Sequence, residues 1–197
     1  MPGADGGRTL VGSVLATLDG RLAGASDAPA WAVPHLGSDA VREHRERLHA
    51  AATTALLGEG DFVRARESWP AVARDDAADA RDRAFASWLE QVEKIVFSTT
   101  MTEPGWDNTW VLEVDPSQVA SHLRRRRGDD VLVLGGSVVT RLLAVDALDR
   151  LAVVWCPEVV GDGPRLFGDG PSAARWALTG STVSDTGAHC AVYDRAR

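Results

Sequence analysis

A glycine pair at the end of an apolar run is the first feature of this sequence that could do chemistry. Residues 131–134 are all apolar, and Gly135, Gly136 and Ser137 follow directly. Glycines let a backbone approach a phosphate group closely, because no Cβ stands in the way. A helix that starts there offers free N–H groups and the positive end of its dipole. The turn predicts a phosphate-bearing ligand, although two glycines also fit a tight strand-to-helix turn that binds nothing.

Two other predicted strands end in residues of the same kind. Gly58 follows the β-branched and apolar run 53–57, and Ser98, Thr99 and Thr100 follow the predicted strand 94–97. In open α/β sheets, ligands bind outside the carboxyl ends of the strands. Hydroxyl groups at such ends suit phosphate or ribose oxygens, but Ser and Thr also serve ordinary turns and caps. The three strand ends together favour a nucleotide site.

The elements that must position these residues follow from apolar runs and turn signals. We expect strands at residues 10–18, 53–57, 94–97, 109–114, 131–134 and 150–156. Helices are expected at 40–51, capped by Ser38, at 85–92, at 116–127 and at 138–145, with a helix start or turn at 59–68 closed by Trp69-Pro70. We expect a loop at 24–37, a surface excursion at 74–83, and two final strands at 176–183 and 189–194.

This alternation predicts an α/β fold with a mostly parallel central sheet, helices on both faces and a C-terminal antiparallel hairpin. The 197 residues, with 45% hydrophobic and 25% charged, fit one globular domain over residues 1–197. No linker or internal repeat divides them.

Charge and composition exclude several classes of partner. The net charge of −7 disfavours nucleic acid, and the basic run 124–127 is expected to end a helix. No apolar run is long enough for a membrane helix, and residues 1–8 do not resemble a signal peptide, which predicts a cytoplasmic protein with no membrane partner. Cys156 and Cys190 are expected to be reduced thiols. No metal is expected, because the histidines lack ligand spacing: His35, His44, His49, His122 and His189.

The order of short motifs resembles a known family. Residues 17–24 read TLDGRLAG, and ALLG at 55–58, KIVFSTT at 94–100, WDNT at 106–109 and VLGGS at 133–137 follow in order. Trp69-Pro70, LDRL at 148–151, the stretch 157–163 and RLF at 165–167 complete the series. The chain resembles the dihydrofolate reductase-like superfamily, and within it the reductase domain of riboflavin biosynthesis, the RibD C-terminal type, over almost its whole length.

That resemblance implies a bound NADPH and hydride transfer to a small substrate. Leu15 and Ala23 would touch the nicotinamide amide through their backbones, and Ser98 and Thr99 would sit near the adenosine ribose. Gly58 would follow the second strand at the cofactor site. The pyrophosphate would lie along four residues: Gly135, Gly136, Ser137 and Val138. The resemblance also implies a homodimer.

One departure from the family concerns the adenosine end of the cofactor. Members commonly carry Gly-Arg after the second strand, and that Arg faces the 2′-phosphate of NADPH. Here the residues are Gly58, Glu59, Gly60 and Asp61. A carboxylate repels a phosphate but can accept hydrogen bonds from a free 2′-hydroxyl. We therefore expect weakened NADPH preference, with NADH used instead or the cofactor bound poorly, unless Arg64 or Arg66 supplies the cation.

The sequence gives a less direct indication of the proton donor than of the cofactor site. Reduction of a C=N or C=O bond needs a proton from a side chain or an ordered water. By spacing, Glu43 is the nearest counterpart of the carboxylate that binds the pterin in dihydrofolate reductases, with Asp39 and Glu46 as rivals. All three also fit a solvated helix face. The leading interpretation is an NAD(P)H-dependent reductase acting on a pterin, pyrimidine or related substrate, and the alternative is a non-catalytic ligand-binding member of the fold.

Overall fold

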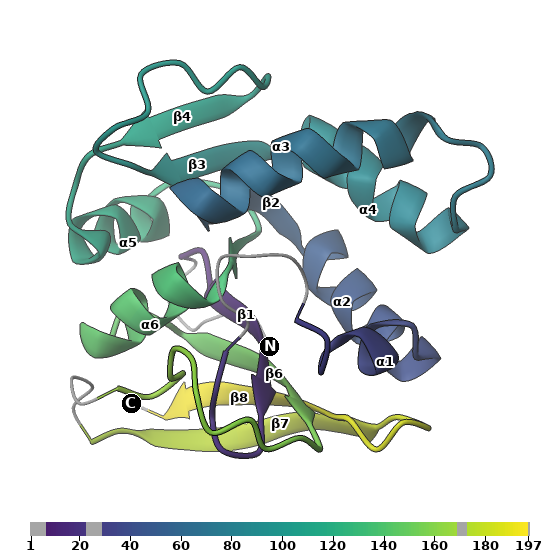
Figure 1. The fold of residues 1–197 in the computed structure, drawn as a ribbon. Helices are drawn as coiled ribbons and strands as arrows, with labels where there is room; N and C mark the ends of the chain where they lie inside the picture. The colour runs from purple at the N-terminus through teal and green to yellow at the C-terminus, as the bar shows by residue number, and fades with distance from the viewer. Residues whose placement is uncertain (1–6, 23–28, 169–172, 197) are drawn as a thin grey trace.

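One eight-stranded sheet runs through the chain, in the order β4-β3-β2-β5-β1-β6-β8-β7 (Figure 1). The computed structural model describes residues 7–22, 29–168 and 173–196. The parallel strands are β1 (Leu10–Thr17), β2 (Ala52–Gly58), β3 (Glu93–Phe97), β4 (Thr109–Leu112), β5 (Asp130–Leu134) and β6 (Arg150–Cys156). All six predicted strands form, and the apolar residues of the central strands β1, β2, β5 and β6 are mostly buried, whereas the edge strand β4 leaves Trp110 exposed.

The last two strands form the predicted antiparallel hairpin. Strand β8 (His189–Ala196) pairs antiparallel with β6 and with β7 (Arg175–Val183), which is the edge of the sheet. The α/β fold with a mostly parallel sheet and this hairpin is therefore confirmed.

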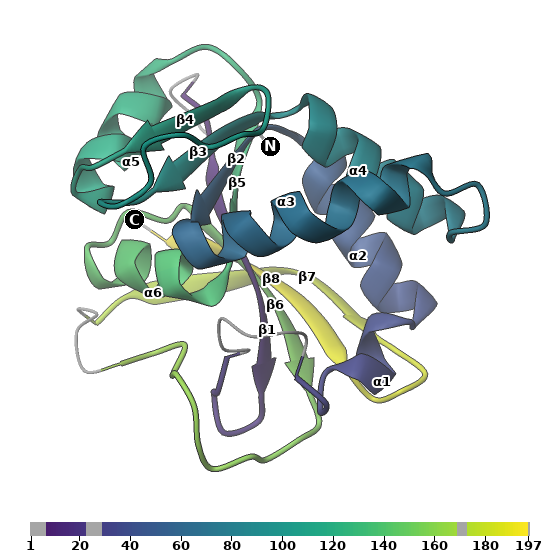
Figure 2. The ribbon, with the colours of Figure 1, turned by 45° about the horizontal axis from the view of Figure 1, so that its top comes forward.

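The helices cover the sheet from both sides (Figure 2). They are α1 (Val33–Leu36), α2 (Asp39–Ala50), α3 (Glu59–Arg74), α4 (Ala80–Gln91), α5 (Pro116–Arg125) and α6 (Gly136–Ala144). Leu123 of α5 and Leu142 of α6 pack in the largest core cluster with Val133. Phe62 of α3 and Trp88 of α4 pack on the other face. None of the helices in the described ranges is long and apolar enough to cross a membrane.

Helix α3 is longer than predicted, because it continues through Pro70 to Arg74. A proline removes one helical hydrogen bond and usually ends a helix. Here the preceding Trp69 packs edge-on against Phe85 of α4, with ring centroids 4.8 Å apart. Contact with α4 therefore holds the last turn of α3 in place. The predicted excursion at 74–83 was also too long, because α4 already begins at Ala80, where Asp79 accepts a hydrogen bond from Arg81 N.

Other boundaries differ by smaller amounts. The short helix α1 lies within the predicted loop 24–37. Helix α2 follows Ser38 as predicted, but the Ser38 side chain makes no capping hydrogen bond. Helix α5 ends at Arg125 instead of residue 127, and α6 begins at Gly136 instead of Val138.

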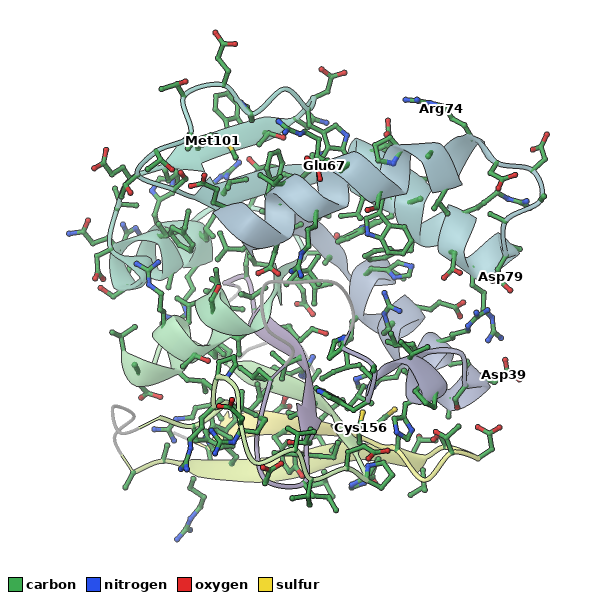
Figure 3. All side chains as sticks on the ribbon, in the orientation of Figure 1. Asp39, Glu67, Arg74, Asp79, Met101 and Cys156 are labelled. Atoms are coloured by element: carbon green, nitrogen blue, oxygen red, sulfur yellow. The ribbon has the colours of Figure 1, made fainter. Side chains whose placement is uncertain are left out.

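Ion pairs join α2 to the start of α4. Asp39 and Asp79 stand near the first turns of these helices on the same side of the molecule (Figure 3). Arg81 of α4 lies 2.8 Å from Asp39, and Arg42 of α2 lies 2.8 Å from Asp79. The two arginines thus each reach an acid at the start of the opposite helix, and these ion pairs connect α2 and α4 at the surface.

His44 lies on the buried face of α2, and its protonation state affects the stability of the fold at acidic pH. His44 is 4% exposed, and its Nε2 has no hydrogen-bond partner within the described part of the chain. Burial, followed by Coulombic effects of Arg47 and Arg45, lowers the pKa of His44 from 6.5 to about 4. Folding therefore favours the neutral ring, so this stabilisation is complete above pH 6.5 and is lost as the pH falls toward about 4.

We predict that His44→Leu makes the fold less sensitive to acid. Between pH 7 and pH 5, the loss of unfolding free energy should be smaller than in the wild type by about 1–2 kcal/mol. Chemical denaturation at the two pH values measures the difference. His122→Leu, at an exposed position, is the control and should keep the acid sensitivity of the wild type. An equal loss in His44→Leu and the wild type would contradict the assignment.

Candidate active site

The carboxyl ends of β2 and β5 bring two of the predicted glycine positions together. The strands are parallel neighbours, with Leu57 opposite Leu134, so Gly58 and Gly135 follow at the same edge of the sheet. A Cβ added to Gly58 would lie 3.2 Å from Ser137 Oγ and 3.3 Å from Val138 Cγ2. Residues predicted from separate motifs thus meet at one point.

Gly135 makes the turn from β5 into α6. Its φ of +100° is in the region that favours glycine, and it occupies the N-cap position of α6. The N–H groups of the next residues have no acceptor within the helix. The positive end of the α6 dipole therefore points toward the edge where Gly58 and Gly135 meet.

This edge opens into a cleft of about 630 Å³ between the sheet and helices α1 to α4. Of the predicted site residues, Leu15, Gly135 and Gly136 line it. Arg42 and Arg45 of α2 form part of its wall. Helices α3 and α4 contribute the lining residues Asp61, Arg64, Ala65, Ser68, Trp69 and Asp82. Ala23, predicted to touch the cofactor, lies outside the described residues.

The segment after β1 is fixed over one end of this cleft. Asp19 accepts hydrogen bonds from Thr17 Oγ1 at 2.6 Å and from Gly161 N at 2.9 Å, and the pKa of its carboxyl falls to about 2, with the Thr17 bond as the largest cause. Leu22 N donates to Pro164 O at 2.8 Å. Leu22 thereby packs directly on Gly136, where an added Cβ would lie 2.8 Å from Leu22 Cδ1.

A separate groove of about 200 Å³ lies at the end of β3, and its lining includes Ser98, Thr99 and Glu59. The assignment of Ser98 and Thr99 to the adenosine ribose stays a prediction. The Glu59 carboxylate accepts a hydrogen bond from Ser98 Oγ at 2.5 Å and another from Thr100 Oγ1 at 2.7 Å. These two bonds lower the pKa of Glu59, so the carboxylate is held ionised. Glu59 thus binds the hydroxyl of Ser98, which the resemblance places near the ribose, and that of Thr100.

The cation in this groove is Arg141 of α6. Its guanidinium lies 5.8 Å from the ring centroid of Phe97. Of the alternatives considered from the sequence, Arg64 pairs with Asp61, and Arg66 donates to Pro104 O at 2.8 Å. The signal for Arg141 was its spacing, because it stands four residues after Ser137, one helical turn along the same face.

The acids of α2 that were considered as proton donors do not line the cleft. The Glu43 side chain is 54% exposed and lies 3.8 Å from Arg47 Nη1. Asp39 and Glu46 both pair with Arg81. Two other carboxylates line the cleft instead, Asp61 of α3 and Asp82 of α4. The geometry lends Glu43 no support, and its catalytic role stays a prediction from spacing.

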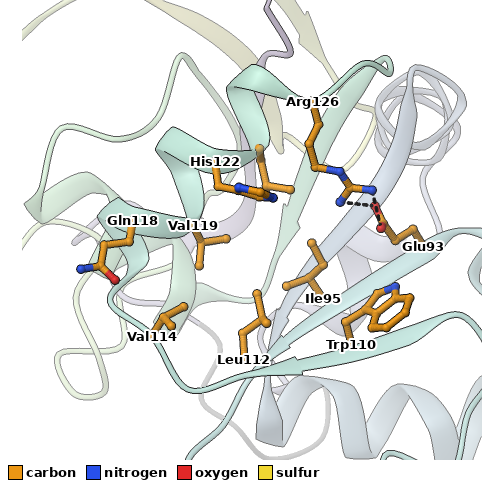
Figure 4. Close-up of a pocket in the computed structure, with 10 residues that line it drawn as sticks. Glu93, Ile95, Trp110, Leu112, Val114, Gln118, Val119, His122 and Arg126 are labelled. Atoms are coloured by element: carbon orange, nitrogen blue, oxygen red, sulfur yellow. Dashed lines mark hydrogen bonds and ion pairs between the residues drawn. The ribbon is translucent and has the colours of Figure 1, made fainter.

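A second pocket, of about 510 Å³, lies between α5 and strands β3 and β4 (Figure 4). It is mainly apolar, with Ile95, Leu112 and Val119 on its walls, and Arg126 pairs with Glu93 at one end. No predicted site residue lines it. Within the described ranges, no group of three His, Cys, Asp or Glu residues could hold a metal ion.

Comparison with known proteins matches the chain to solved structures across its length. A protein of Shewanella sp. PV-4 assigned to riboflavin biosynthesis has a TM-score of 0.73 at 18% identity, over 96% of this chain and 99% of that chain. A pyrimidine reductase-like protein of Corynebacterium diphtheriae has a TM-score of 0.63 at 14% identity, over 96% and 92% of the two chains.

The dihydrofolate reductase of Enterococcus faecalis, solved in complex with NADP(H), has a TM-score of 0.59 at 16% identity, over 96% of this chain and 97% of that chain. No curated protein matches the chain. The family model of the RibD C-terminal domain matches residues 8–190. The chain therefore belongs to the RibD C-terminal domain family, whose fold it shares.

Proposed function

We propose that this protein is an NAD(P)H-dependent reductase that transfers a hydride to a small heterocyclic or carbonyl substrate. The observation that carries the proposal is the turn of Gly135 and Gly136 on the wall of the cleft at the start of α6, with Gly58 at the neighbouring strand end. A Cβ at Gly135 would collide with the Asp61 carboxylate, and one at Gly58 would lie 3.2 Å from Ser137 Oγ, so both strand ends have little room for a side chain. Family membership supports the same reaction class, and one structural neighbour was solved with NADP(H).

Different residues of the chain would hold different parts of such a cofactor. Gly135, Gly136, Ser137 and Val138 would lie along the pyrophosphate at the start of α6, where backbone N–H groups favour an anion. Ser98 and Thr99 would face the adenosine ribose. Leu15 and Ala23 would contact the nicotinamide amide through their backbones. Reduced nicotinamide supplies the hydride, and the protein orients it against the substrate and excludes water.

The substrate would occupy the part of the cleft beside α2 and α3. Trp69 lines that part and offers an aromatic face, and Arg42 and Arg45 offer positive charge. A pterin, a pyrimidine or a related ring fits this lining. The proton would come from Glu43, as the spacing predicts, or from an ordered water.

We further propose that the protein acts as a single cytoplasmic domain that forms a homodimer, without nucleic acid or membrane partners. Gel filtration tests the assembly, because a monomer would elute near the chain mass of 21.0 kDa.

A second candidate function is ligand binding without catalysis. Glu59 holds the hydroxyls of Ser98 and Thr100, and the Asp61 carboxylate lies against Gly135, so acids stand at both ends of the proposed cofactor site. A member of the fold that had lost cofactor affinity would carry such residues.

We predict that a reduced nicotinamide cofactor raises the melting temperature of the protein. A ligand that binds only the folded state adds about 2.7 kcal/mol to the unfolding free energy at a concentration about 100 times Kd. A thermal-shift assay with NADPH and NADH measures this, and the loss of reduced-nicotinamide absorbance with candidate pterins and pyrimidines measures turnover. No thermal shift with either cofactor at millimolar concentration would favour the non-catalytic alternative.

We also predict that Glu59 sets the choice between the two cofactors. The wild type should not bind NADPH more tightly than NADH, because Glu59 repels a 2′-phosphate. Glu59→Arg should improve NADPH affinity about tenfold relative to NADH, since the new cation would stand with Arg141 in the groove.

The matched control is Glu67→Arg, which makes the same charge change at an exposed position of α3. It should leave the ratio of the two affinities unchanged. Much tighter binding of NADPH than NADH by the wild type would show that Arg141 outweighs Glu59, and would contradict this prediction.

A further inference from the structure

The Asp61 carboxylate fills the gap between the two glycine turns of the cleft. Asp61 belongs to the first turn of α3, which begins directly after Gly58. A Cβ added to Gly135 would lie only 1.9 Å from Asp61 Oδ2, and one added to Gly58 would lie 3.8 Å from the same atom. The missing side chain of Gly135 is therefore what makes room for this carboxylate.

The carboxylate is poorly hydrated and only partly compensated in this place. The Asp61 side chain is 21% exposed and pairs with Arg64, one turn later on α3. Burial nevertheless outweighs the attraction of Arg64 and raises the pKa of Asp61. The ionised carboxylate thus loses favourable hydration in this position. It lies next to the start of α6, where the helix dipole would also favour phosphate oxygens.

The other charged groups of the cleft are engaged elsewhere or lie on other walls. Arg42 of α2 pairs with Asp79 and lies 4.0 Å from Asp82 of α4. The Arg45 guanidinium stacks on Phe85, 5.3 Å from the ring centroid. The turn from β5 into α6 adds no charged group to the cleft lining, since its residues there are Leu134, Gly135 and Gly136.

We infer that Asp61 is an internal anion that competes with the pyrophosphate of the cofactor for the gap beside Gly135. This inference rests on the proposed function. A carboxylate and a phosphate cannot share the space, and their like charges repel. Binding of a dinucleotide therefore requires the Asp61 side chain to leave Gly135, and protonation of Asp61 helps it to do so. The gap beside Gly135 is thus closed to the pyrophosphate until this carboxylate moves.

The test is the affinity of the wild type, Asp61→Asn and Asp61→Ser for NADPH and NADH. Calorimetry or energy transfer from tryptophan to reduced nicotinamide measures Kd. We expect about tenfold tighter binding for Asp61→Asn, which removes the charge but keeps the size, and at least as much for Asp61→Ser, which also frees space. Asp76→Asn, in the exposed loop between α3 and α4, is the control for net charge and should bind like the wild type.

A second arm of the test uses pH. The affinity of the wild type should rise as the pH falls from about 8 to about 5.5, because Asp61 takes up a proton when the pyrophosphate binds. Asp61→Asn cannot take up this proton, so its advantage over the wild type should shrink over the same range. Thermal unfolding of each variant checks that it is folded.

The outcomes separate this inference from the proposed function. If the wild type and both Asp61 variants bind a cofactor with equal affinity, the proposed function stands and the role of Asp61 is wrong. If no variant binds either cofactor at millimolar concentration while all remain folded, both are wrong. If Asp61→Asn and Asp61→Ser bind a cofactor more tightly than the wild type and Asp76→Asn do, the result supports both the proposed function and the role of Asp61.

Discussion

The parallel pairing of β5 with both β1 and β2 is the constraint on which the rest of the structure depends. Strand β5 lies between two strands that are far earlier in the chain, and its register places Leu134 opposite both Ser13 and Leu57. Val131 and Val133 are buried in one core cluster and Leu132 in another, so a slip in register would disrupt the packing of both clusters. This pairing alone brings the end of β2 beside the start of α6.

The first turn of helix α3 matters both for the stability of the helix and for the candidate active site. It starts at the residue after Gly58, and acids in the first turn of a helix are favoured by its dipole. Glu59 and Asp61 therefore suit the helix that carries them. Glu59, however, stands where the resemblance to the family implies an arginine that faces the 2′-phosphate of NADPH. Glu59 and Asp61 thus favour the start of α3 and would oppose the phosphorylated cofactor proposed for the neighbouring turn.

The sequence predicted what depends on local pattern and missed what depends on contacts between distant elements. The apolar runs identified all six parallel strands, and the glycines identified the turn into α6. Pro70 was read as an end of α3, because its packing through Trp69 on Phe85 involves a helix that follows later in the chain. Arg141 and the cleft position of Asp61 were missed for the same reason, since both depend on how α3 and α6 approach across β2 and β5.

Many polar side chains around the cleft already contact one another, and these contacts determine how a ligand would bind there. Asp61 pairs with Arg64, Arg42 with Asp79, and Glu59 with two hydroxyls, so many of the groups that could meet a dinucleotide already have partners. Binding is then an exchange of contacts, and its free energy is the difference between the old and the new ones. A single substitution that frees a cation or removes an anion changes that difference directly. Glu59 lies in the groove at the end of β3 and Asp61 in the cleft, so substitutions at the two positions would change the binding of the proposed cofactor separately, while the sheet beneath them stays the same.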